Sequence, residues 1–167
     1  MASPRGAILS GWAAAVLHGI PGDFLDGTTD GIKPRAVEFI VPPHGGAYER
    51  DGLRLRWAPC RVEDLVSYHG HPVTNGMRTA ADLTRWARYP EKALAAIDMS
   101  LRHGLTTRRE LEQMQVPRMK GYRGIQLVRD ALAIASDRAE SPRESELRYY
   151  WLESGLPTRE SMLRSMT

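Results

Sequence analysis

The sequence is poor in cysteine and has no long apolar run. Its single cysteine, Cys60, excludes a disulfide within the chain and suits a reducing cytoplasm. His, Gly or Asp interrupts every window before it reaches the roughly 18 apolar residues of a membrane span. The apolar run that ends at His18 contains Trp12, which is atypical of the apolar core of a signal peptide. We therefore expect a soluble, cytoplasmic protein with no membrane partner.

Motifs of the common enzyme classes are missing as well. The chain has no G-x-S-x-G, no phosphate-binding loop of the P-loop type, no G-x-G-x-x-G and no Cys–His pair of known spacing. Its 167 residues are 42% hydrophobic and 26% charged, the balance of one ordinary globular domain. We expect no cofactor.

Hydrophobic periodicity predicts an α+β fold. A small N-terminal sheet or hairpin region with one helix is expected to precede a helical C-terminal half. The expected helices are 7–18, 79–89, 90–104, 107–115, 125–135 and 141–155, and the expected strands are 36–41, 53–57 and 65–69, the last turning at Gly70 to pair with 72–74. Pro117 to Gly124 is expected to be a loop.

Positive charge is concentrated in residues 102–130. The segment has seven Lys or Arg and three acids, so its charge of +4 exceeds the net +3 of the whole chain. Such a segment attracts phosphate-bearing partners, and its glycines would let the backbone approach a phosphate. The alternative is a solvated helix face followed by a loop of solvated cations. The candidate nucleic-acid-binding residues are Arg108, Arg109, Arg118, Lys120, Tyr122 and Arg123.

Four stretches carry a resemblance to a known family. They are S-G-W-A-A-A-V-L-H-G at 10–19, V-T-N-G-M-R-T-A-A-D-L at 73–83, A-L-A-A-I-D-M-S-L-R-H-G-L-T at 93–106, and A-E-S-P-R-E-S-E-L-R at 139–148 followed by G-L-P at 155–157. In this order they resemble an actinobacterial family that joins an AbiEi-antitoxin-like region to an endonuclease-like domain. That domain is related to very-short-patch-repair nucleases of the PD-(D/E)XK class. The resemblance implies an AbiEi-like region over 1–135 and the first helix of a nuclease-like domain, with a tail, over 136–167.

Two departures from the family pattern shape the functional expectation. The family usually begins with a winged helix-turn-helix, which the residues before position 7 are too few to form. Its nuclease strands, with an Asp and a Glu-x-Lys pair, would follow Pro157, where ten residues remain. The resemblance therefore implies a non-catalytic, DNA-associated regulatory or antitoxin-like protein. A phage or mobile-element origin would fit such a shortened chain. The alternatives are a protein-interaction module that binds a host or toxin partner and, less favoured, a metal-dependent endonuclease completed by a second chain.

Four further groups of residues are candidates for caps, ion pairs or metal ligands. Glu144 matches the helix that holds a metal-binding Glu in such nucleases, but with Ser141 and Pro142 it also fits a capping box. A zinc site is one interpretation of His69, His71, Cys60 and His44, although their spacing differs from that of paired structural ligands. Asp82 follows Arg78 by four residues, the spacing of an ion pair on a helix surface. His18 and His103 each precede a glycine and are expected to cap helix C-termini.

The last helix carries an apolar stripe. Leu147, Tyr150 and Trp151 follow the i, i+3, i+4 spacing of one helix face. Two large aromatic side chains bring more apolar area than one short neighbouring helix covers. We therefore predict a homodimer through these residues, with packing against the helix at 125–135 as the alternative.

Overall fold

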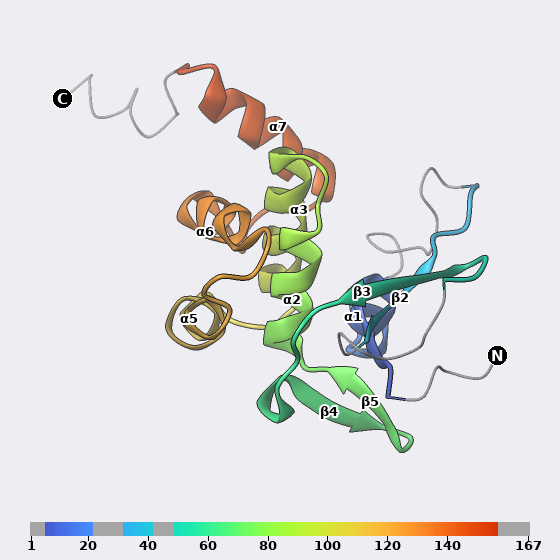
Figure 1. Cartoon of the computed structure of the whole chain (residues 1–167). Coiled ribbons are helices and arrows are strands. Elements are labelled where there is room, and N and C mark those ends of the chain that lie inside the picture. Colours follow the sequence, from blue (N-terminus) through green and yellow to red (C-terminus); the bar gives the residue numbers. More distant parts are fainter. Residues whose placement is uncertain (1–5, 22–31, 42–48, 157–167) are drawn as a thin grey trace.

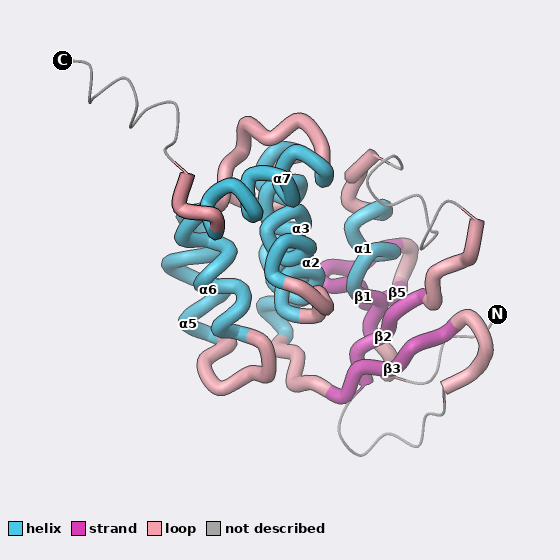
Figure 2. The backbone as a smooth tube through the Cα atoms, turned by 90° about the horizontal axis from the view of Figure 1, so that it is seen from above, coloured by secondary structure: helices cyan, strands magenta, loops and turns pink. Residues whose placement is uncertain are grey.

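The computed structural model describes residues 6–21, 32–41 and 49–156 and has an α+β fold, as the sequence predicts. A mixed sheet and one helix form one side of the molecule, and the remaining helices form the other (Figures 1 and 2). The helical side begins with α2 (Gly76–Arg85), which follows directly after the last strand.

The sheet has five strands in the order β3-β2-β1-β5-β4. In chain order they are β1 (Ile8–Ser10), β2 (Val37–Val41), β3 (Leu53–Trp57), β4 (Leu65–Tyr68) and β5 (His71–Thr74). The central strand β1 is antiparallel to β2 and parallel to β5, and β2 is parallel to β3. The strands predicted near 36–41 and 53–57 and the pairing across Gly70 are confirmed.

The predicted helix over 7–18 is wrong in its first turn. Residues Ile8–Ser10 form β1, and the helix α1 begins only at Gly11 and ends at Leu17. Gly11 has φ +62°, and a Cβ at this position would lie 2.2 Å from the Glu38 carboxylate oxygen Oε2. Only glycine makes this strand-to-helix junction without strain. Periodicity alone cannot separate so short an apolar strand from a helical turn.

The helical half begins three residues earlier than predicted. The Asn75 side chain accepts a hydrogen bond from the Arg78 backbone N–H at 2.9 Å, and so caps α2. Thr79, the predicted cap, is buried, and its hydroxyl is 2.7 Å from that of Thr74. The helix ends at Arg85 rather than at residue 89.

Five further helices and a π-helical turn complete the helical half. They are α3 (Pro90–Arg102), α4 (Arg108–Glu110), the π-helical turn Leu111–Gln115, α5 (Val116–Arg118), α6 (Ile125–Ile134) and α7 (Pro142–Glu153). The predicted box at Thr107 and Glu110 is confirmed, with each side chain bonding the other residue's backbone N–H. The helix continues through Pro117 and Arg118, so the predicted loop begins later, after α5.

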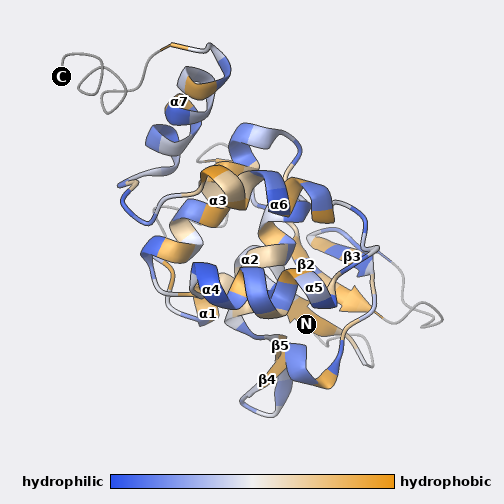
Figure 3. Cartoon of the chain, turned by 90° about the vertical axis from the view of Figure 1, so that its left-hand side faces the viewer, coloured by the Kyte–Doolittle hydropathy of each residue, from blue (hydrophilic) through white to orange (hydrophobic). Residues whose placement is uncertain are grey.

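The main core lies around α3, which packs against α2, α6 and α7 (Figure 1). Leu94 and Ile97 of α3 are fully buried together with Leu111 and Val128. In Figure 3, α3 carries strongly apolar stretches, whereas apolar and polar residues alternate along α7. None of the helices in the described ranges is long and apolar enough to cross a membrane.

Polar contacts fasten α7 to this core. Arg148 donates hydrogen bonds to the Asp98 carboxylate and to the Ile134 carbonyl. Asp98 is itself fully buried and also accepts a bond from the Ser136 backbone N–H at 2.7 Å. His18 and His103 occupy the C-cap positions of α1 and α3, as predicted.

Candidate functional site

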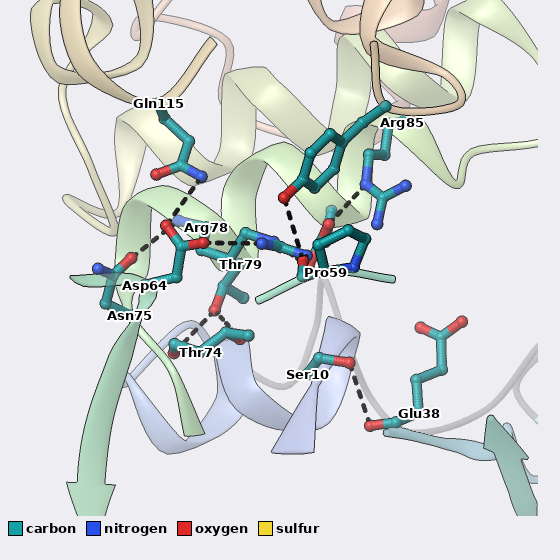
Figure 4. A network of polar contacts seen from close by, with 12 residues as sticks. Ser10, Glu38, Pro59, Asp64, Thr74, Asn75, Arg78, Thr79, Arg85 and Gln115 are labelled. Atoms are coloured by element: carbon teal, nitrogen blue, oxygen red, sulfur yellow. Dashed lines mark hydrogen bonds and ion pairs between the residues drawn. The ribbon is translucent and has the colours of Figure 1, made fainter. Parts of the chain in front are cut away.

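A buried ion network lies where α2 meets the sheet (Figure 4). Arg78 Nε donates to Asp82 Oδ2 and Arg78 Nη1 donates to Asp64 Oδ2, both at 2.8 Å. The side chains of Arg78 and Asp82 have no exposed area, and that of Asp64 is 3% exposed. The prediction of a surface pair for Arg78 and Asp82 is therefore wrong. The spacing of four residues pairs Arg78 with Asp82 correctly, but the burial of this pair also depends on Asp64, which lies on another part of the chain.

With Arg85, whose Nε pairs with Asp82, the network holds two arginines and two carboxylates, and each charge has an opposite partner. Burial disfavours the charged form of Arg78, yet Asp82, Cys60 and Asp64 together raise its pKa above the ordinary value. The Gln115 amide nitrogen donates to Asp64 Oδ1 at 3.3 Å. The Pro59 carbonyl accepts from Arg78 Nη2 at 3.0 Å, which fixes the chain just after β3.

Arg85 extends the network toward the surface. Its Nε donates to Asp82 Oδ1 at 2.6 Å, and its Nη1 donates to the Arg123 carbonyl at 3.1 Å. The remaining nitrogen, Nη2, is buried and has no hydrogen-bond partner among the described residues. Burial lowers the pKa of Arg85, against the opposing effect of Asp82. An acceptor for this guanidinium would therefore be stabilising.

Tyr122 closes the space between the α5–α6 loop and the sheet. Its hydroxyl donates to the Pro59 carbonyl at 3.3 Å. The guanidinium carbons of Arg78 and Arg85 lie 5.5 and 5.8 Å from its ring centre, at cation–π distances. The loop approaches α2 closely at Gly124, which has φ +81° and whose Cβ would lie 2.5 Å from the Arg85 carbonyl.

A cleft of about 350 Å³ opens between residues 57–59, at the end of β3, and residues 120–123 of the α5–α6 loop. We refer to it as the Trp57–Arg123 cleft. Its lining consists of Trp57, Ala58, Pro59, Arg85, Lys120, Gly121, Tyr122 and Arg123. Three of these residues are cations and none is an acid, so the lining is suited to an anionic ligand.

The structure brings together three of the six predicted nucleic-acid-binding residues, namely Lys120, Tyr122 and Arg123. Arg109 bonds Gln113, and Arg118 lies on α5 outside the cleft lining. Arg108 donates to the carbonyls of Leu132 and Ala135 and thus caps the C-terminus of α6.

Sequence reasoning missed Trp57 and Arg85 as part of this site. The stretch at 73–83 that carries the family resemblance contains Arg78 and Asp82. Arg85 follows Asp82 by three residues, so the same helix spacing could have added it to the pair. No local signal links Trp57 to Lys120.

Cys60 lies beside the network and is half-buried. Burial raises the pKa of its thiol to about 11; Arg78 lowers it, and Asp64 and Asp82 raise it further. No group of three His, Cys, Asp or Glu residues within 6–21, 32–41 and 49–156 is placed to hold a metal ion. His69, on the β4–β5 turn, and His71, the first residue of β5, are both exposed, and His44 is outside the described residues.

Glu144 and Ser141 are at the start of α7. The Ser141 hydroxyl accepts a hydrogen bond from the Glu144 backbone N–H at 3.2 Å, so the predicted N-cap is confirmed. The Glu144 carboxylate bonds the Glu140 N–H at 2.7 Å rather than that of Ser141, so the reciprocal half of the predicted box is wrong. At the start of α7, the Glu144 carboxylate therefore reaches the N–H one residue before the N-cap.

The predicted interface residues lie on the outer side of α7. Leu147 is 68% exposed, Tyr150 56% and Trp151 43%. Tyr149, on the inner side, packs against the core around α3. The alternative, in which these three residues are buried against the helix at 125–135, is therefore wrong within this chain.

Comparison with known proteins identifies relatives but no described function. The chain matches two uncharacterized proteins from two strains of Mycobacterium tuberculosis, each 42% identical over 110 residues. The match covers 66% of this chain and 36% of each relative, so it spans about a third of the relatives' length. No family model matches the chain. No solved structure matches it either.

Proposed function

We propose that this protein is a non-catalytic, nucleic-acid-associated regulatory protein of antitoxin-like type that works in the cytoplasm. The Trp57–Arg123 cleft carries this proposal, because it combines three cations with aromatic side chains and excludes acids. Phosphate contacts supply most of the affinity in non-specific nucleic-acid binding. The resemblance of residues 10–19, 73–83 and 93–106 to AbiEi-antitoxin-like proteins supports the same class.

Buried ion pairs favour a binding role for the site rather than catalysis. Both carboxylates, Asp64 and Asp82, are engaged by arginines and are shielded from solvent. A general base must reach the proton it removes, and a metal-binding carboxylate must reach the ion. Lys120 and Arg123, by contrast, are exposed at the cleft mouth.

Removal of the cleft charges tests the proposal. The Lys120→Ala/Arg123→Ala variant should bind a fluorescein-labelled DNA oligonucleotide at least 10-fold more weakly than the parent at low salt, by anisotropy. The Arg138→Ala/Arg143→Ala variant removes the same charge from two exposed positions outside the cleft and outside residues 102–130. It should bind nearly as well as the parent. Equal weakening by both variants would contradict a role for the cleft.

A second candidate function is a protein-interaction module that self-associates through α7. The observation that favours it is the exposure of Leu147, Tyr150 and Trp151 on one helix. A symmetric dimer would cover this face with the same face of a second copy. Light scattering at micromolar concentration should give the dimer mass for the parent and the monomer mass for Trp151→Glu. A parent of monomer mass would remove the basis for this candidate.

A further inference from the structure

The Trp57–Arg123 cleft is preformed. One wall, after β3, is fixed because the Pro59 carbonyl accepts hydrogen bonds from Arg78 Nη2 at 3.0 Å and from the Tyr122 hydroxyl at 3.3 Å. The other wall is fixed because the Arg123 carbonyl accepts from Arg85 Nη1 at 3.1 Å. Both arginines are held in turn by Asp82. A ligand that enters therefore loses little affinity to ordering of the site.

Of the two aromatic residues that line the cleft, Trp57 is free to contact a ligand, whereas Tyr122 is already engaged within the protein. Tyr122 already has its hydroxyl bonded to Pro59 and its ring within 6 Å of two guanidinium groups. Trp57 ends β3 with 54% of its surface exposed, although it lines the cleft. An exposed indole at the edge of a cationic cleft is a surface on which a nucleobase stacks.

The shape of the site favours a single strand over a duplex. Proteins read the duplex by inserting a helix or a β-ribbon into the major groove, which needs a protruding element. The cleft is concave, and its volume of about 350 Å³ lies at the lower end of the range for small-ligand pockets. One unstacked nucleotide matches this size.

From these observations we infer that the cleft binds one unstacked nucleotide of a single-stranded DNA, with the base on Trp57 and the phosphate at Lys120 and Arg123. This inference rests on the proposed function and names the form of nucleic acid that the site takes. Arg85, whose Nη2 has no partner among the described residues, adds positive charge to the cleft lining. An approaching phosphate would be attracted to this charge.

Oligonucleotides that differ only in their bases separate stacking from charge. The probes are labelled oligothymidylate, an abasic deoxyribose-phosphate oligomer of the same length, and a duplex. The parent should bind oligothymidylate on the order of 10-fold more tightly than the abasic oligomer, the contribution of one stacked base. The Trp57→Leu variant should lose that difference and bind the abasic oligomer as the parent does.

Two variants act as controls. Trp57→Phe should retain most of the preference for oligothymidylate, because it retains a ring. Tyr68→Leu, at an exposed aromatic residue on β4 outside the cleft lining, should change nothing. Equal binding of oligothymidylate and the abasic oligomer by the parent would overturn the inference. The proposed function would survive that result if the Lys120→Ala/Arg123→Ala variant still lost affinity for both. Tighter binding of the duplex would also overturn the inference.

Discussion

Replacement of Arg78 by methionine should strongly destabilise the protein. Arg78 is fully buried and donates to Asp64, to Asp82 and to the Pro59 carbonyl. Without it, Asp82 keeps only its bond to Arg85, and Asp64 keeps Gln115 and the Arg61 backbone N–H. Removal of one partner of a buried ion pair typically costs about 3–5 kcal/mol. This loss is a large part of the 5–15 kcal/mol by which domains are usually stable.

Urea unfolding followed by circular dichroism measures this loss. With a denaturant slope of about 2 kcal/mol/M, the midpoint of the Arg78→Met variant should fall by about 2 M. Arg138→Met removes an exposed arginine and should stay within about 0.5 kcal/mol of the parent. The Asp64→Asn/Arg78→Met double variant should be more stable than Arg78→Met, because it leaves one fewer buried charge unpaired.

A loss below about 1 kcal/mol for Arg78→Met would refute this reasoning, because so small a value is typical of an exposed ion pair. The same conclusion would follow if the double variant were less stable than the single one by the full cost of a second independent substitution.

Three further predictions concern caps and titrating groups. Thr107→Ala should lower the free energy of unfolding by about 1 kcal/mol, because the Thr107 hydroxyl caps the Glu110 N–H; a loss near zero would contradict the cap. The raised pKa of Cys60 means that the folded chain keeps a proton that the unfolded chain releases, so stability should fall as pH rises from 9.0 to about 11. The Cys60→Ser variant should lack this fall in pH-dependent urea unfolding. Glu144→Ala should lower the free energy of unfolding by about 1 kcal/mol, because the Glu144 carboxylate accepts a hydrogen bond from the Glu140 N–H. The parent should not cleave plasmid DNA with Mg²⁺ or Mn²⁺; cleavage that is lost in Glu144→Ala would contradict this structural role.

Features set by neighbouring residues were predictable from the sequence. The turn between β4 and β5 follows from His69 and Gly70, both of which have positive φ, and Tyr68 pairs with His71 across it. The caps at Thr107 and Ser141 follow from a hydroxyl three residues before the N–H that it accepts. Each feature depends on a few adjacent residues, and this is why a local pattern reveals it.

Features set by distant residues were not predictable. The sequence pairs Arg78 with Asp82, but their burial requires Asp64 and Gln115, which lie 51 residues apart and bond across the network. β1 is three residues long, and it is a strand because β2 and β5 flank it. The cleft combines Trp57 with a loop more than 60 residues later. Lys120, Tyr122 and Arg123 were identified from the sequence, but Trp57 and Arg85 join them only through tertiary packing.

The most direct test of the central claim is the salt dependence of DNA binding. For single strands, the logarithm of the affinity falls with the logarithm of salt concentration, with a slope of about −0.7 for each phosphate contact. Because Lys120 and Arg123 hold the phosphate of one nucleotide in the cleft, the Lys120→Ala/Arg123→Ala variant should have a slope shallower by about 0.7 than the parent. The Arg138→Ala/Arg143→Ala variant should keep the parent's slope. An unchanged affinity and slope in the cleft variant would contradict the claim that this cleft binds nucleic acid.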